Sequence, residues 1–171
     1  AAGKTTLVDQ LLFKTGAVAH LGSVDHGTSV CDFDDEEKTH RHTIETKFVH
    51  FEYGGKLFHV ADTPGYPDFI GQAICSFRGV DTAVIVVNAH TGVGVNTRRC
   101  WDEAVRDDLG RMIVINKLDL AWKNPGFEEE INVYQRIGYP VLLVSAATGE
   151  GIEELKQALQ GKLSVLVGKS G

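Results

Sequence analysis

The sequence predicts an α/β fold in which helices cover both faces of a mostly parallel sheet. Short runs rich in β-branched residues alternate with amphipathic helical segments through the second half of the chain. The intervals between these runs are long enough for the crossover helices that parallel strands require. Earlier in the chain, Gly54-Gly55 joins two segments of alternating character, which predicts an antiparallel hairpin at one edge.

Length and composition bound the class of protein. A chain of 171 residues with 43% hydrophobic and 23% charged residues is typical of a single soluble domain spanning 1–171. The net charge of −6 gives no direct nucleic-acid signal. The sequence shows no signal peptide or membrane-length apolar run, and its three dispersed cysteines fit a reduced compartment. We therefore expect a cytoplasmic protein without a membrane partner.

The first half of the chain has two helical segments, a loop and the hairpin. Apolar residues at helical spacing follow the first glycines, and Gly16 is a suitable stop for that helix. No period persists over 17–43, so we expect a long loop there, with its acidic run at 34–37 solvated. The expected elements are helices at 5–14 and 68–78 and strands at 45–53 and 56–61.

The second half alternates strand and helix. The expected strands are 83–87, 112–115, 141–144 and 163–167, and the expected helices are 95–109, 127–137 and 152–159. In the first of these helices, the helical period directs Val95, Trp101, Val105 and Leu109 toward the core. The last strand is short and wholly apolar at its end, which is typical of a strand buried on both faces.

The two ends of the chain carry the halves of a phosphate-binding loop. Ala2-Gly3-Lys4-Thr5-Thr6 opens the first helix without a preceding strand, whereas the last strand runs into Gly168-Lys169-Ser170-Gly171. In an intact loop, backbone N–H groups cradle phosphates, the lysine neutralises charge and the threonine hydroxyl holds Mg²⁺. Joined end to end, Gly168 and Gly3 are separated by five residues, one more than the standard four. The alternative interpretation is two unrelated glycine-rich ends.

Polar motifs also follow the hairpin and the strand at 112–115. In Asp62-Thr63-Pro64-Gly65, Asp62 can reach Mg²⁺ through water and the Gly65 amide can meet a γ-phosphate. In Asn116-Lys117-Leu118-Asp119, the carboxylate of Asp119 would accept two hydrogen bonds from guanine while Lys117 lies along the base. Alone, each motif is equally well explained as a turn or a polar strand end.

Two further segments complete the predicted site. Ser145-Ala146-Ala147 ends another strand, where the Ala146 amide could meet the guanine O6 atom. Thr43, just before the first strand, is a candidate second ligand of Mg²⁺, although it could simply initiate the strand. Because parallel sheets bind ligands at the carboxyl ends of their strands, the motifs together predict a site for GTP or GDP with Mg²⁺.

Residues 2–123 resemble the GTPase domain of elongation factor G-like translation factors. The resemblance is carried by the first glycine-lysine motif, by 31–38, by Asp62-Thr63-Pro64-Gly65-Tyr66-Pro67-Asp68-Phe69 and by Asn116-Lys117-Leu118-Asp119. Residues 127–171 resemble instead the circularly permuted GTPases that act in small-subunit ribosome maturation. That second resemblance is carried by 134–139, 144–151 and 161–171.

The order of the two parts, 1–123 and 124–171, suggests a chimera, engineered or recombined. The resemblance implies a doubly wound, six-stranded P-loop GTPase fold, circularly permuted with the phosphate-loop strand at the C-terminus. It also implies binding of guanine nucleotide and Mg²⁺, and ribosome association in the parent families.

One residue departs from the family pattern. Translation-factor GTPases typically place histidine after Asp-x-Pro-Gly to orient the attacking water, whereas this chain has Tyr66. A phenol is a poor proton acceptor near neutral pH, so we expect weak or slow hydrolysis. The catalytic candidates are Lys4, Thr43, Gly65 and Tyr66. The alternatives are a structural permutant that binds no nucleotide and an adenine-nucleotide enzyme, against which Asp119 argues.

Overall fold

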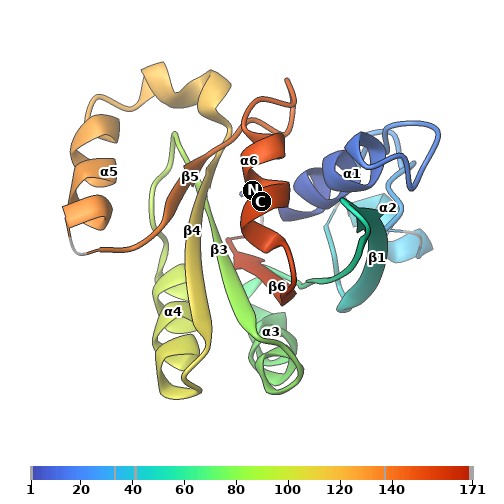
Figure 1. Cartoon of the computed structure of the whole chain (residues 1–171), viewed down its shortest axis with the longest axis horizontal. Helices are drawn as coiled ribbons and strands as arrows, with labels where there is room; N and C mark the ends of the chain where they lie inside the picture. Colours follow the sequence, from blue (N-terminus) through green and yellow to red (C-terminus); the bar gives the residue numbers. More distant parts are fainter. Residues whose placement is uncertain (1, 33, 41, 137, 170–171) are drawn as a thin grey trace.

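The computed structural model describes residues 2–32, 34–40, 42–136 and 138–169, and it is built on a six-stranded sheet (Figure 1). The strand order is β1-β2-β6-β3-β4-β5. The strands are β1 (Lys47–Tyr53), β2 (Lys56–Asp62), β3 (Thr82–Asn88), β4 (Gly110–Asn116), β5 (Val141–Leu143) and β6 (Leu163–Gly168). Among these six described strands, only the β1–β2 pair is antiparallel, as the Gly-Gly turn predicts.

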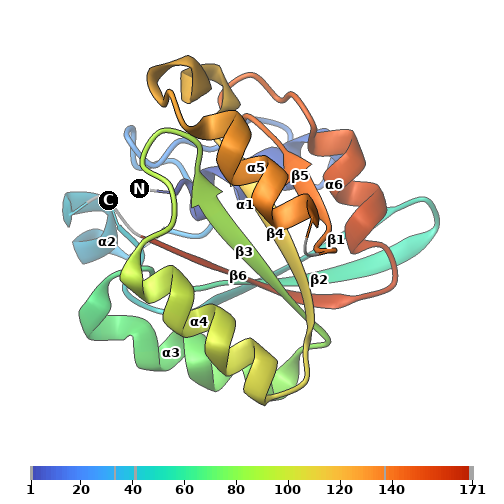
Figure 2. The same ribbon diagram turned by 90° about the vertical axis from the view of Figure 1, so that its left-hand side faces the viewer.

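Helices cover both faces of this sheet. The α-helices are α1 (Lys4–Lys14), α2 (Asp35–His40), α3 (Ile70–Ser76), α4 (Val95–Arg106), α5 (Phe127–Arg136) and α6 (Ile152–Leu159). Short 3₁₀ segments lie at Pro67–Phe69, Phe77–Gly79 and Leu118–Lys123. Helices α1 and α6 pack on one face, and α3, α4 and α5 pack on the other, which is the nearer face in Figure 2.

Alternation along the central strands supplies the two cores. In β3, Val84 and Val86 join the core beneath α1 and α6, whereas Ile85 and Val87 join the core beneath α3 and α4. A strand covered on both faces must be apolar at successive positions, which is why the sequence shows continuous runs instead of alternation.

The C-terminal strand β6 lies at the centre of the sheet. It pairs in parallel with β2 on one side and β3 on the other. Its residues Val165, Leu166 and Val167 are wholly buried. At its end, a Cβ atom on Gly168 would lie 2.2 Å from the carbonyl oxygen of Val86, so only glycine allows this close approach. The prediction that 163–167 forms a buried central strand is confirmed.

Two sequence predictions are wrong in detail. The segment 17–43 contains α2, a helix of 6 residues that is too short for a periodic pattern to reveal. Its first turn is stabilised by Asp34, whose Oδ1 atom accepts the N–H of Glu36 at 2.9 Å.

The second error concerns the buried face of α4. Val95 is 84% exposed and Val105 is 47% exposed, while Thr97, Cys100 and Ala104 are buried. The smaller side chains face the sheet because they let the helix approach β3 and β6 closely, and Trp101 packs partly buried beside them. The largest difference between a predicted and an observed boundary is at the end of α4, which ends at Arg106 instead of at 109.

Among the described residues, no helix combines the length and apolar character needed to cross a membrane.

The central position of β6 predicts a strong contrast between two leucines in strands. Leu166→Ala removes a fully buried side chain, so we expect the free energy of unfolding to fall by about 2–5 kcal/mol. Leu57→Ala, on the half-exposed hairpin strand β2, should change it by about 0.5 kcal/mol or less. Urea denaturation followed by circular dichroism measures both, and similar small losses would contradict a central β6.

Candidate functional site

A polar cavity of about 360 Å³ lies where the ends of the central strands meet the first turn of α1. The predicted site residues that line it are Gly3, Lys4, Thr5, Thr6, Thr43, Gly65, Lys117, Ala146 and Ala147. Asp32, His42, Lys169 and residues 21–25, which the sequence did not single out as site residues, line it as well. Motifs far apart in the chain therefore converge at one edge of the sheet.

A larger cavity of about 420 Å³ lies elsewhere, over β3 and β4 beside α4. Aliphatic and aromatic side chains, including Trp101, Tyr134 and Tyr139, form much of its lining. None of the predicted site motifs lines it, so the smaller polar cavity is the candidate site.

The first turn of α1 meets the end of β6 at this cavity. The backbone N–H of Ala2 donates to the carbonyl oxygen of Lys169 at 2.8 Å. The ammonium group of Lys4 donates to the carbonyl oxygen of Gly168 at 2.9 Å. Burial lowers the pKa of Lys4, and the nearby Asp62 carboxylate partly opposes this shift. Ser170 and Gly171, also predicted to contact phosphate, lie outside the described residues.

Gly3 is required by both its backbone and its surroundings. Its φ angle of 77° lies in the left-handed region that favours glycine. A Cβ atom there would lie 2.7 Å from the side-chain nitrogen of Asn116. Any other residue at position 3 would therefore be strained and would push Asn116 away.

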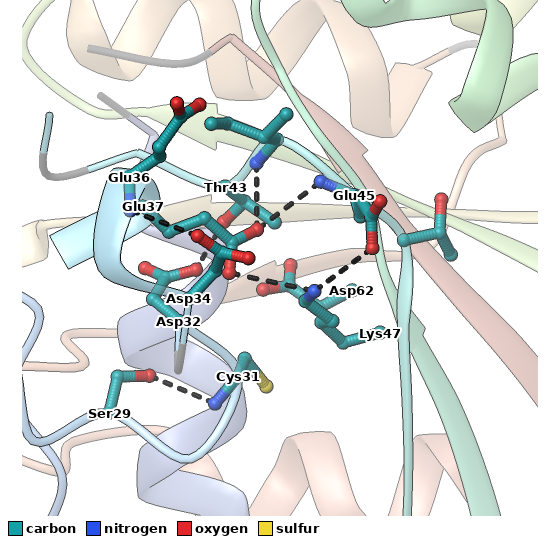
Figure 3. Close-up of polar contacts among 12 residues, drawn as sticks. Ser29, Cys31, Asp32, Asp34, Glu36, Glu37, Thr43, Glu45, Lys47 and Asp62 are labelled. Atoms are coloured by element: carbon teal, nitrogen blue, oxygen red, sulfur yellow. Dashed lines mark hydrogen bonds and ion pairs between the residues drawn. The ribbon is translucent and has the colours of Figure 1, made fainter.

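Hydroxyl and carboxylate oxygens meet at the cavity wall, and Figure 3 shows Thr43 close to Asp32 and Asp62. The Thr5 hydroxyl donates to Asp62 Oδ2 at 2.7 Å and lies 2.9 Å from the Thr43 hydroxyl. The Thr43 hydroxyl donates in turn to Asp32 Oδ1 at 2.8 Å. Burial raises the pKa of Asp62 to about 7, although Lys4 and the Thr5 hydrogen bond pull it down.

This cluster fits a magnesium ion chemically. Mg²⁺ prefers hard oxygen donors, and Thr5, Thr43 and Asp62 bring three such groups together. The buried atoms Asp62 Oδ1 and Asp32 Oδ2 have no hydrogen-bond partner among the described residues. An unpaired buried carboxylate oxygen is costly, and a cation would satisfy it. No three His, Cys, Asp or Glu side chains form a metal cluster in the described part of the chain, so a magnesium ion at this cluster would need hydroxyl oxygens among its donors.

Glu37 anchors the segment that carries Thr43. The acidic run at 34–37 is not fully solvated, because Glu37 is only 1% exposed. Its Oε1 atom accepts the backbone N–H groups of Ile44 at 2.9 Å and Glu45 at 3.2 Å. Its Oε2 atom lies 3.5 Å from the ammonium of Lys47, a pair also visible in Figure 3. One buried member among four adjacent carboxylates has no signature in the sequence, so sequence reasoning missed it.

Asn116 connects the phosphate side of the cavity to the opposite side. Its side-chain nitrogen donates to the carbonyl oxygens of Ala2 at 2.9 Å and Gly3 at 3.3 Å. Its side-chain oxygen accepts the N–H of Ala146 at 2.9 Å. The Ala146 amide that was expected to meet a guanine oxygen therefore binds Asn116 in this structure.

Asp119 is placed near the site but does not line the cavity. Its side chain is exposed and accepts a hydrogen bond from the Ser145 hydroxyl at 2.6 Å. Lys117, which does line the cavity, has a φ angle of 66°, an uncommon conformation for a residue with a side chain. In the loop after β4, Lys117 therefore lines the cavity whereas Asp119 lies outside its lining.

Tyr66 lies beside the cavity and stacks against His42. The ring centroids are 4.5 Å apart and the ring planes are inclined by 28°. His42 itself lines the cavity, whereas Tyr66 lines an adjoining one with Gly65 and Lys169. No sequence pattern pairs these two rings, because they come from different loops.

Comparison with known proteins gives a consistent family. Residues 1–164 match the model of the elongation factor Tu GTP binding domain. An elongation factor G-like protein of Mycobacterium tuberculosis is 36% identical over 92% of this chain and 22% of its own length. The mitochondrial ribosome-releasing factor 2 of Lodderomyces elongisporus is 31% identical over 98% of this chain and 20% of its own length. The chain thus spans about a fifth of the length of these curated relatives.

Solved structures show the same fold. The protein ttk003000868 from Thermus thermophilus has a TM-score of 0.73 and 36% identity, covering 81% of this chain and 21% of that one. A bacterial selenocysteine-specific elongation factor, EF-Sec, has a TM-score of 0.72 over 93% of this chain and 26% of its own, and its 24% identity supports the fold alone. With the family model matching nearly the whole length, this chain belongs to the family of elongation factor Tu GTP-binding domains.

Proposed function

We propose that this domain binds GTP and GDP together with Mg²⁺ and hydrolyses GTP slowly. The observation that carries the proposal is the convergence of Lys4, Thr5, Thr43 and Gly65 around one polar cavity at the strand ends. Family membership supports guanine as the base, since the matching model is a GTP-binding domain.

Each group has a role that its chemistry suits. The Lys4 ammonium, held out of water, offers a concentrated positive charge to a phosphate. Thr5, Thr43 and Asp62 would hold Mg²⁺, which when bound offsets the negative charge of the phosphates. Gly65 lines the cavity, and its backbone amide would donate to the terminal phosphate.

Base recognition is assigned to the loops after β4 and β5. Asp119 carries a carboxylate that accepts hydrogen bonds, which suits the N–H groups that guanine presents and adenine lacks on that edge. Lys117, Ala146 and Ala147, from the same two loops, line the cavity. Because one Asp119 oxygen already accepts the Ser145 hydroxyl, the carboxylate is oriented before any base arrives.

We further propose that the phosphate loop is divided between the two ends of the chain, in a circularly permuted arrangement. Support comes from the central position of β6, which leads to Gly168 and Lys169 beside the first turn of α1. The hydrogen bond from Ala2 to Lys169 joins the two halves. A chimeric origin rests on the two resemblances alone. A structural permutant without nucleotide binding is the alternative, and a GDP titration separates the two.

The cellular context is also proposed from relatives. One relative is named as an elongation factor G-like protein and another as a ribosome-releasing factor. A cytoplasmic setting and association with a ribosome follow as proposals, because this chain spans only about a fifth of those proteins.

The first test is binding. GDP with Mg²⁺ at 100 times its dissociation constant should raise the free energy of unfolding by about 2.7 kcal/mol, visible as a higher melting temperature. Lys4→Ala should abolish this increase, because the buried ammonium is lost from the phosphate side. No stabilisation of the parent by GDP would favour the structural permutant.

A second test concerns the base. Asp119→Asn places an amide donor where guanine also donates, so GDP binding should weaken by about 1–3 kcal/mol and xanthine nucleotide should gain. Asp102→Asn on α4 is the matched control, since this exposed carboxylate lies by the apolar cavity instead. Isothermal titration measures both, and equal GDP affinity in Asp119→Asn and the parent would contradict the assignment.

A third test concerns hydrolysis. Tyr66→His restores an imidazole directly after Gly65, so single-turnover cleavage of GTP should rise about tenfold or more, with little change in GDP affinity. A rapid-quench measurement follows the cleavage. An unchanged rate with intact binding would show that the residue at position 66 does not limit the reaction.

A further inference from the structure

The position that supplies an imidazole in the resembling translation factors holds Tyr66 here, yet another histidine, His42, lines the cavity. His42 lines the cavity together with Lys4, Thr43 and Gly65. We propose that His42, from the loop before β1, orients the attacking water for GTP hydrolysis in this chain. The proposal rests on the proposed function and names a residue that the family pattern does not assign.

The Tyr66 ring stacks on the His42 ring, which indicates a structural role for Tyr66. With centroids 4.5 Å apart and an inclination of 28°, the two rings lie face against face. Contacts of this kind restrict how an aromatic ring can turn. Tyr66 therefore serves as a support for the imidazole, and its hydroxyl group takes no part in the chemistry.

A backbone contact sets which nitrogen of His42 is free. Its Nδ1 atom lies 2.9 Å from the carbonyl oxygen of His40. A carbonyl oxygen only accepts hydrogen bonds, so the neutral ring must carry its hydrogen on Nδ1. The Nε2 atom is then left with its lone pair, which is what a water-orienting group needs.

Glu37 places His42 and the proposed metal ligand Thr43 as one unit. The N–H of His42 donates to the backbone oxygen of Glu37 at 3.3 Å. Two residues further on, the N–H of Ile44 donates to the Glu37 carboxylate at 2.9 Å. Held on both sides by one buried residue, the imidazole and the Thr43 hydroxyl keep a fixed relation to each other.

The reaction balances without another reactant. The water oxygen bonds to the γ-phosphorus while the bond from that phosphorus to the bridging oxygen breaks, and GDP leaves with the bridging electrons. His42 Nε2 accepts a hydrogen bond from the water and fixes its direction. The proton of the water ends on the phosphate products, so His42 is unchanged after the cycle.

The experiment compares single-turnover GTP cleavage with GDP affinity in the whole chain. His42→Ala should cleave GTP about 10- to 100-fold more slowly and bind GDP within about twofold of the parent. His59→Ala, an exposed histidine on β2, is the matched control and should match the parent in both. Tyr66→Ala removes the supporting ring and should cleave GTP several-fold more slowly than Tyr66→Phe, which keeps the ring.

A rescue variant separates a chemical role from a structural one. His42→Ala combined with Tyr66→His returns an imidazole to the cavity from the other loop and should recover the lost rate. The side-chain amide in His42→Gln can also orient water, so this variant should retain part of the parent's cleavage rate. It keeps the test decisive if His42→Ala folds poorly.

Different experimental outcomes would contradict the role of His42 and the proposed function. Parent-like cleavage by His42→Ala with GDP binding intact overturns the role of His42, as does a parent that binds GTP and does not cleave it. Absence of nucleotide binding in the parent overturns the proposed function itself.

Discussion

The parallel pairing of β6 with both β2 and β3 is the constraint on which the molecule depends. Without that strand, the hairpin β1–β2 and the strands β3, β4 and β5 would be two separate pieces of sheet. The pairing also sets the site, because it brings Gly168 and Lys169 to the start of α1 and places Asp62 beside Leu166. Pairings between residues that are 104 positions apart (β2–β6) and 82 positions apart (β3–β6) thus determine both the cores and the arrangement of the candidate site.

Much of the fold follows from the sequence because buried strands and a Gly-Gly hairpin leave strong local signals. The middle residues of β3, β4 and β6 form continuous apolar runs, as expected for strands that are covered on both faces. The prediction of the buried face of α4 was wrong because the helical period was read from large apolar residues. Close packing of the helix on the sheet instead buries the small residues Cys100 and Ala104. Local pattern and tertiary fit differ most where a helix lies close to a strand.

Some residues of the candidate site were also predicted from the sequence, and others were not. Motifs at a helix start or strand end predicted Lys4, Thr5 and Asp62, and Thr43 was a candidate from the loop before the first strand; the structure brings these four residues together, and their binding roles remain predictions. Glu37 and His42 could not be predicted, because their importance comes from contacts with other loops that no spacing encodes. Asp119 and the Ala146 amide were predicted as base readers, and the structure shows their hydrogen-bonding groups already engaged within the protein.

The three hydrogen bonds of Asn116 carry a consequence for energetics. One side chain holds two carbonyl groups of the first glycine turn and one amide from the loop after β5. The side-chain amide of Asn116 thus links the first turn of α1 directly to the loop after β5. On the proposed function, the contributions of a nucleobase and of its phosphates to affinity would therefore not be independent, and a double-mutant cycle across Asn116 would give a coupling free energy instead of a simple sum.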